Sequence, residues 1–162
     1  MAVAVVLVVL AAASVAGLLP LQLMRVGSGS MQPTLTAGDL VVVDRTSGPV
    51  ARGDVVAARH PVTGDLLVKR VVGAAGDRVA IEDGRLVVDG EPMCEPGIDP
   101  ERLDGVFFGP VTVPAGEVFL LGDARGDSVD SRVFGTVPDG DVVGQVGARV
   151  WPAPGALPAY GC

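Results

Sequence analysis

The hydrophobic pattern divides the chain into an apolar start and a longer part built from short runs. No side chain from Met1 to Met24 is charged, and the first charge is Arg25. About 20 apolar residues are enough for a helix to cross the core of a bilayer, so this stretch predicts a transmembrane anchor over residues 1–24. Two alternatives stay open. One is a cleaved signal peptide, for which Ala11–Ala16 offers small residues although no basic region precedes them, and the other is a buried core helix.

After Met24 the pattern changes to short Val-rich runs separated by turn residues. Valine is stiff at χ1 and packs well on a pleated surface, so we interpret these runs as strands. They cover Asp39–Arg45, Asp54–His60, Leu66–Val72, Arg78–Glu82, Arg85–Asp89, Glu117–Leu121 and Asp141–Trp151. Two Asp-Gly pairs, Asp83-Gly84 and Asp89-Gly90, predict tight hairpins. The stretch Glu91–Pro110, rich in Pro, Gly and acidic residues, predicts an irregular excursion.

The predicted fold is therefore mainly β, with a single N-terminal transmembrane helix followed by an antiparallel β-sheet domain. The anchor covers residues 1–24, the β-rich domain residues 25–151, and a Pro-rich tail residues 152–162. A chain of 162 residues is long enough for one domain with a sizeable core.

Charge and cysteine content exclude several classes of function. The net charge is −7 and no Lys/Arg cluster is present that could follow a phosphate backbone, so we expect no nucleic-acid partner. The two cysteines, Cys94 and Cys162, are too few for a disulfide framework, and no Cys/His cluster predicts a metal site. Whether these two cysteines pair stays open, because the sequence does not show whether their Cα atoms approach.

Ser30 is the first candidate for catalysis. It lies in Gly27-Ser28-Gly29-Ser30-Met31-Gln32-Pro33-Thr34, where glycines on one side and a proline on the other predict a tight exposed turn. A serine at neutral pH is a weak nucleophile and needs a base within hydrogen-bond reach. The chain has one histidine, His60, and no motif around it supports a Ser-His-Asp triad, so we interpret it as an edge or turn residue.

Lys69 is the better candidate for the base. It lies inside the apolar run Leu66–Val72, and burial there would lower its pKa by disfavouring the ammonium form. A neutral amine can accept a serine proton, and Ser-Lys pairs are a known variant of the triad. On this run alone, a lysine on a solvated face is the simpler reading.

A third segment, Gly122–Arg132, changes that balance. It is a polar loop between apolar runs, and its Asp and Arg side chains can form a charge network while Ser128 can hydrogen-bond an amine. Taken alone it would be a solvated acidic loop. A serine turn, a lysine strand and this loop, in this order after an apolar start, instead indicate a membrane-bound serine protease.

The three segments together resemble the boxes of bacterial type I signal peptidases, the Ser/Lys family that removes signal peptides from exported preproteins. The nucleophile box is matched by Ser28–Leu35, the lysine box by Lys69–Gly73 with Gly76-Asp77, and the third box by Gly122-Asp123 through Ser128, Asp130, Ser131, Arg132 and Gly135. The resemblance runs from the apolar start to about Trp151. The eukaryotic relatives have His in place of this Lys, so Lys69 is similar to the bacterial branch.

The resemblance implies a role for each matched residue. Ser30 would be the nucleophile and Lys69 the general base, and the backbone N–H of Ser30 with the hydroxyl of Ser28 would form the oxyanion hole. Ser128 would orient Lys69, and an Asp130–Arg132 ion pair would shape the third box. Pockets for small side chains of an extended substrate would be formed by Val26, Met31, Leu35, Leu67 and Val68. No metal or other cofactor is implied.

The third box departs from the family pattern at two positions. It usually begins Gly-Asp-Asn-Arg, and here Ala124 replaces the Asn, while Asp127 stands where another Asn is common. These changes put the hydrogen bonds of the loop in question more than the dyad.

The predicted function is membrane-bound serine endopeptidase activity that cleaves signal peptides after small residues. The resemblance implies a single-pass protein of the cell membrane with its catalytic domain on the extracytoplasmic side. Its partners would be preprotein signal peptides, membrane lipid and the protein export machinery. Alternatives are a maturation peptidase dedicated to one precursor, and a non-catalytic membrane-tethered domain that binds extended peptides by strand addition.

Overall fold

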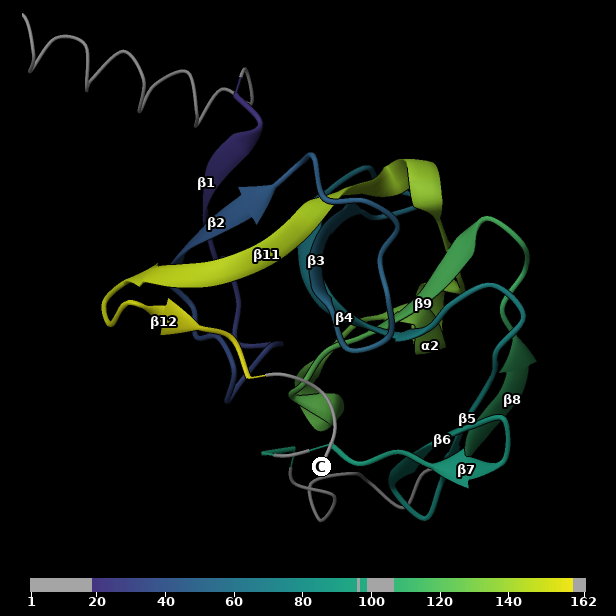
Figure 1. Cartoon of the computed structure of the whole chain (residues 1–162). Helices are drawn as coiled ribbons and strands as arrows, with labels where there is room; N and C mark the ends of the chain where they lie inside the picture. The colour runs from purple at the N-terminus through teal and green to yellow at the C-terminus, as the bar shows by residue number, and fades with distance from the viewer. Residues whose placement is uncertain (1–18, 96, 99–106, 159–162) are drawn as a thin grey trace, which may run out of the picture.

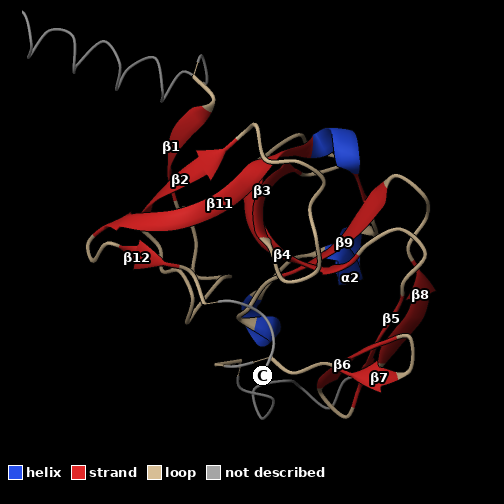
Figure 2. Cartoon of the chain, viewed as in Figure 1, coloured by secondary structure: helices blue, strands red, loops and turns tan. Residues whose placement is uncertain are grey.

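The fold consists of two antiparallel β-sheets (Figures 1 and 2). The computed structural model describes residues 19–95, 97–98 and 107–158. The larger sheet has the order β1 (Leu21–Arg25), β2 (Leu40–Asp44), β11 (Val142–Trp151), β3 (Val55–Arg59), β4 (Leu66–Gly73), β9 (Glu117–Leu121) and β10 (Val137–Pro138), with β12 (Gly155–Ala156) paired to β11. The smaller sheet has the order β7 (Glu91–Pro92), β6 (Arg85–Val88), β5 (Arg78–Glu82) and β8 (Phe108–Thr112).

Short helices lie mainly beside β9. A 3-10 turn covers Arg125–Asp127, the four-residue helix α2 covers Ser131–Phe134, and a second 3-10 turn covers Asp139–Asp141. The third box therefore leaves the end of β9 and is folded into one 3-10 turn and one helical turn. The Asp130 side chain caps α2 by accepting from the backbone N–H of Arg132.

The predicted antiparallel β architecture is confirmed, and each of the seven predicted runs contains a strand. Both Asp-Gly hairpins are also confirmed. In the first, Asp83 and Gly84 have φ of 47° and 76°, and Glu82 pairs with Arg85. Positive φ at both central residues gives a turn whose twist matches that of the strands it joins, which is why Asp-Gly is favoured there.

Five strands lie where no strand was predicted, namely β1, β7, β8, β10 and β12. β1 covers Leu21–Arg25, so the last four positions of the predicted anchor, residues 21–24, are in a strand paired with β2 and not in a helix. β12 lies within the predicted tail, and β8 begins inside the predicted excursion Glu91–Pro110. Each of these strands is hydrogen-bonded to a neighbouring strand, so that pairing decided them more than local preference did.

The predicted anchor lies mostly outside the described residues, because its positions 1–18 are not described. Within residues 19–158, as far as they are described, no helix is long and apolar enough to cross a membrane.

Three apolar clusters form the core, and two of them support the site. One joins the nucleophile turn to the larger sheet and contains Val26, Met31 and Leu35 beside Val41, Val43, Val55, Ala57 and Val146. A second fills the space between β4, β9 and the smaller sheet. Gly73 at the end of β4 allows this close packing, since a Cβ there would lie 2.4 Å from a methyl group of Val79. The sheets thus meet at the end of β4, four residues beyond Lys69.

Candidate active site

The nucleophile turn presents Ser30 by burying its neighbours. Met31 and Leu35 are 1% and 0% exposed in the core, while Ser28 is exposed and Ser30 is partly exposed. The backbone N–H of Gln32 donates to the carbonyl of Gly29 at 3.0 Å, and that of Leu35 donates to Met31 at 2.9 Å. The buried apolar residues therefore anchor the turn in the core, while Ser30 between them and the surface stays partly exposed.

Lys69 reaches the serine from β4. Its residue is 4% exposed, and its Nζ lies 2.7 Å from Ser30 Oγ and 3.0 Å from Ser128 Oγ. As an ammonium it donates to both hydroxyls, and as a neutral amine it can accept the proton of Ser30. The predicted contact between Ser30, Lys69 and Ser128 is present, although 39 and 59 positions separate Lys69 from its partners in the sequence.

The surroundings of Lys69 lower its pKa below the ordinary value of 10.5. Burial is the largest cause, because removal from water disfavours the charged amine. The carboxylates of Asp130 and Asp123 raise the pKa, and the guanidinium of Arg132 lowers it. The net direction favours a neutral amine, which is the form that a general base needs.

Lys69 is also the one lysine in the whole sequence, the other eleven of its 12 cationic residues being arginines. Arginine keeps its proton at any pH at which proteins are studied, so lysine is the side chain suited to a switchable proton. This signal was available in the sequence and was missed there.

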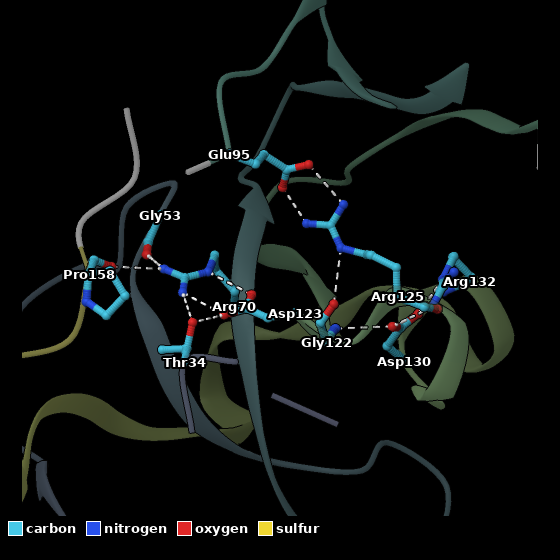
Figure 3. A network of polar contacts seen from close by, with 10 residues as sticks. All are labelled: Thr34, Gly53, Arg70, Glu95, Gly122, Asp123, Arg125, Asp130, Arg132 and Pro158. Carbon is cyan, nitrogen blue, oxygen red and sulfur yellow. Dashed lines mark hydrogen bonds and ion pairs between the residues drawn. The ribbon is translucent and has the colours of Figure 1, made fainter. Parts of the chain in front are cut away.

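Buried ion pairs hold the third box. Arg70, next to Lys69 on β4, donates from Nε and Nη2 to the two carboxylate oxygens of Asp123 at 2.8 and 2.6 Å. Thr34 of the nucleophile turn donates to Asp123 Oδ2 at 2.5 Å. Figure 3 shows this contact joining all three boxes. The sequence analysis did not predict that Thr34 connects the nucleophile turn to Asp123 of the third box.

Asp130 and Arg132 form the ion pair that the resemblance implied. Arg132 Nε lies 2.8 Å from Asp130 Oδ1, and the Asp130 carboxylate also accepts from the backbone N–H of Gly122 at 3.0 Å. Arg132 Nη2 donates to the carbonyl of Arg125 at 2.6 Å. Asp130 is fully buried, so these donors replace the water that its charge would otherwise require.

Ala124 and Asp127, the two positions that depart from the family pattern, form hydrogen bonds through their backbone N–H groups. The N–H of Ala124 donates to the carbonyl of Ser30 at 3.0 Å, and the N–H of Asp127 donates to Ala124 at 3.0 Å. The loop therefore stays attached to the nucleophile turn although Ala124 has no side-chain amide.

A cavity of about 310 Å³ opens beside the dyad. It is lined by Met24, Arg25, Val26, Gly27, Ser28, Ser30, Met31, Leu66, Leu67, Val68 and Lys69. Four of the five predicted pocket residues are in this lining. The fifth, Leu35, is instead fully buried in the core beneath the turn. Met24, Arg25 and Leu66 were not predicted, because a cavity wall is recognised only after strands from distant segments are placed together.

The oxyanion candidates Ser28 and Ser30 line this cavity. Ser28 Oγ is 3.2 Å from Ser30 Oγ, so its hydroxyl can rotate toward an oxygen that develops next to the nucleophile. His60 is placed elsewhere in a turn. Its Nδ1 accepts from the backbone N–H groups of Val62 and Thr63 at 3.1 and 3.2 Å, as its interpretation as a turn residue predicts.

Comparison with known proteins gives one family. The family model described as signal peptidase, peptidase S26, matches residues 1–151. A signal peptidase I from Bacillus caldolyticus is 40% identical over 138 residues, which cover 76% of this chain and 75% of that protein. A signal peptidase I from Mycobacterium tuberculosis H37Rv is 32% identical, covering 77% of this chain and 63% of that protein.

A solved structure also matches. The crystal structure of a signal peptidase I from Enterococcus faecalis V583 superposes with a TM-score of 0.56 at 28% identity, covering 62% of this chain and 99% of that chain.

Proposed function

The chain belongs to the signal peptidase family, peptidase S26, and from this we propose that Ser30 and Lys69 are its catalytic dyad. The enzyme is a signal peptidase I, a serine endopeptidase, and its substrates are preproteins that carry signal peptides. The observation that supports the dyad most is the 2.7 Å distance between Lys69 Nζ and Ser30 Oγ in a buried setting that lowers the pKa of the lysine.

In the proposed mechanism, neutral Lys69 accepts the proton of Ser30 while the hydroxyl oxygen attacks the scissile carbonyl. The backbone N–H of Ser30 and the Ser28 hydroxyl stabilise the negative oxygen of the tetrahedral intermediate, and one such donor typically contributes about 10²–10³ in rate. The protonated lysine then gives its proton to the leaving amine. The remaining acyl-enzyme is hydrolysed by a water that Lys69 deprotonates.

Ser128 orients the base during these steps. Its hydroxyl lies 3.0 Å from Lys69 Nζ and can accept from the amine, which directs a lone pair toward Ser30. Asp130 and Arg132 support Ser128 from the loop that carries it.

The cavity beside the dyad accounts for a preference for small residues before the cleaved bond. Its walls include Val26, Met31, Leu67 and Val68, whose apolar side chains leave about 310 Å³. We infer that the substrate lies there as an extended strand, with alternate small side chains directed into the cavity.

The apolar stretch that precedes β1 is proposed to anchor the enzyme to the membrane. It contains no charge up to Leu19-Pro20 and has about the length that a spanning helix needs. The β-rich domain would then lie at the extracytoplasmic face, where preproteins emerge from the export machinery.

Cleavage of a preprotein with an Ala-x-Ala site tests the dyad. The full chain in liposomes would be compared with Ser30→Ala and Lys69→Ala, and we expect both variants to lose about 10⁴-fold or more in kcat. Ser47→Ala is the matched control, because Ser47 Oγ donates to the carbonyl of Asp44 away from the dyad. Full activity in Lys69→Ala would show that the base is wrong, and an inactive wild type on several preproteins would contradict the substrate class.

A further inference from the structure

Arg125 is a buried cation of the third box whose partner comes from a distant segment. Its Nη1 donates to Glu95 Oε2 at 2.9 Å, and its Nη2 donates to Glu95 Oε1. Figure 3 shows the two planar groups facing each other in a bidentate pair. Glu95 follows β7 of the smaller sheet and belongs to none of the three boxes. A carboxylate outside the recognised motifs therefore neutralises a charge inside one of them.

The same guanidinium group of Arg125 also binds the backbone of Gly122, which packs against residues of the dyad site. Its Nε donates to the carbonyl of Gly122 at 3.0 Å, while the N–H of Gly122 donates to Asp130 at 3.0 Å. A Cβ at Gly122 would lie 2.2 Å from Ser128 Oγ and 2.5 Å from the carbonyl oxygen of Ser30. Gly122 thus packs directly between the nucleophile turn and the hydroxyl that contacts Lys69, and its position sets theirs.

Glu95 itself is held by its neighbours on the N-terminal side. The backbone N–H of Met93 donates to the carbonyl of Leu86 at 2.8 Å, and Met93 packs on the core of the smaller sheet. Cys94 is disulfide-bonded. The one other cysteine of the sequence, Cys162, lies outside the described residues.

The end of the described chain approaches the same network. The carbonyl of Pro158, four positions before Cys162, accepts from Arg70 Nη1 at 3.5 Å. Figure 3 shows Pro158 beside Arg70, the partner of Asp123 in the third box.

We propose that Glu95 is a positioning residue for the Ser30–Lys69 dyad, acting through Arg125 and Gly122, and that the Cys94 disulfide holds Glu95 in place. This inference rests on the proposed dyad. Glu95 does not touch the substrate cavity. It keeps the guanidinium of Arg125 buried and directed at the Gly122 carbonyl, which keeps Ser128 and Ser30 within reach of Lys69 Nζ.

Loss of the Glu95 carboxylate removes the partner of a buried charge. Without these two bonds from Glu95 the buried guanidinium of Arg125 is held less firmly, because a buried charge depends on its hydrogen-bonded acceptors. The Gly122 carbonyl then loses its donor and the third box loosens around Lys69. Catalysis slows while substrate binding stays, since the cavity is lined by β1, the nucleophile turn and β4. Water that reaches Lys69 also moves its pKa back up toward 10.5.

The first test is steady-state cleavage of a model preprotein by the full chain in liposomes. Glu95→Gln is expected to lower kcat by about 10-fold to 100-fold with KM nearly unchanged, and to move the acid limb of the pH profile to higher pH. Glu91→Gln is the matched control, because Glu91 is an exposed residue of β7 in the same excursion. Unchanged kcat and pH profile in Glu95→Gln, with an active wild type, would overturn the proposal.

A second variant keeps the proposal testable if Glu95→Gln fails to fold. The double variant Glu95→Met with Arg125→Met removes both buried charges, so it avoids an unpaired charge while still lacking the donor to Gly122. We expect it to be folded by circular dichroism and slow in kcat. A folded double variant with wild-type kcat would overturn the role of the Glu95–Arg125 clamp, by which we mean this ion pair together with its hydrogen bond to the Gly122 carbonyl.

The disulfide is tested by reduction with dithiothreitol. The reagent is oxidised to its cyclic disulfide while Cys94 and its partner cysteine gain two electrons and two protons as thiols. Reduction is expected to lower kcat of the wild type several-fold and to have little further effect in Glu95→Gln, because both changes act on the same clamp. Equal losses in both proteins, or none in the wild type, would overturn the link between the disulfide and Glu95.

The single lysine gives a readout that does not depend on turnover. A protein labelled with ¹⁵N at lysine has one side-chain Nζ resonance, and its titration in wild type and Glu95→Gln reports the pKa of Lys69. A higher pKa in the variant is expected, and identical titrations would count against the proposal. Wild type that cleaves no preprotein would instead indicate failure of the proposed function, and this titration would still test the clamp.

Discussion

The nucleophile turn and the third box both contact Lys69, yet different forces hold them. The turn is anchored by apolar side chains, with Met31 and Leu35 in the core of the larger sheet. The third box is anchored by buried polar and charged side chains, among them Asp123, Arg125 and Asp130. Apolar burial is non-directional and tolerates replacement by similar volumes, whereas a buried ion pair fails when either partner is removed.

The difference suits the two tasks. The turn must present one hydroxyl outward, and burying its neighbours is sufficient for that. The third box must hold a hydroxyl at a set distance from an amine, and directional bonds determine distances better than apolar contact does. Substitutions in the two regions should therefore differ in what they damage and by how much.

Removing one partner of the Arg70–Asp123 pair should destabilise the protein most. Arg70→Met leaves Asp123 buried without its cation, and we expect a loss of about 3–5 kcal/mol in the free energy of unfolding. Arg52→Met is the control, because Arg52 pairs with Asp77 with its side chain 38% exposed, and a surface pair contributes about 0–1 kcal/mol. Urea unfolding measures both, and equal losses would contradict the importance of burial.

Gly122→Ala should damage activity more than stability. The added methyl group meets Ser128 Oγ and the Ser30 carbonyl, so both must move away from Lys69. A displacement of about 1 Å in a catalytic group can cost about 10²-fold, and we expect a loss of that order in kcat. Gly147→Ala adds a methyl group with no atom within 4 Å and should leave kcat unchanged. Wild-type kcat in Gly122→Ala would show that the third box does not set the dyad distance.

The pH dependence of cleavage should report Lys69. Only the neutral amine acts as base, so kcat/KM should rise about tenfold per pH unit on the acid side and level off above a pKa that lies below 10.5. The sign for stability is the same. The unfolded chain binds this proton more tightly, so stability rises with pH between the folded pKa and 10.5, and below the folded pKa burial of Lys69 is a constant cost.

Two measurements check this prediction. A pH profile of kcat/KM that stays flat down to acidic pH would contradict the assignment of Lys69. Unfolding of wild type and Lys69→Met across alkaline pH provides the second measurement, because the variant should lack the rise in stability with pH.

Met31→Leu should have the smallest effect. The replacement keeps the volume and apolar character of a core side chain, so we expect a loss below about 1.5 kcal/mol in the free energy of unfolding. Met31→Ala, which leaves a cavity, should cost about 2–5 kcal/mol. Thermal unfolding of the two variants distinguishes these outcomes, and a large loss in Met31→Leu would mean that the turn requires a specific shape.

Most of the larger sheet was predictable because its strands carry local signals. The Val-rich runs, and the Asp-Gly pairs of the smaller sheet, indicate strands and hairpins within a few residues, and the structure has these strands with boundaries shifted by at most one position. In this sheet β1, β10 and β12 were missed because their segments lack such signals and become strands by pairing with β2, β9 and β11.

The chemistry of the site follows the same division. Residue types and their order were enough to name Ser30, Lys69 and Ser128 as candidates, because a hydroxyl nucleophile, an amine base and a supporting hydroxyl are recognised by kind, and the family resemblance implied their roles. The sequence also contains the single lysine of the chain. None of this required a distance.

Only the tertiary structure decided what surrounds these residues. Contacts between distant segments bury Lys69 and lower its pKa, and they pair Glu95 with Arg125. Such contacts also place Leu35 in the core and not, as predicted, in the cavity wall. A sequence pattern reports what each residue can do locally, whereas desolvation and ion pairing depend on neighbours that folding alone brings together.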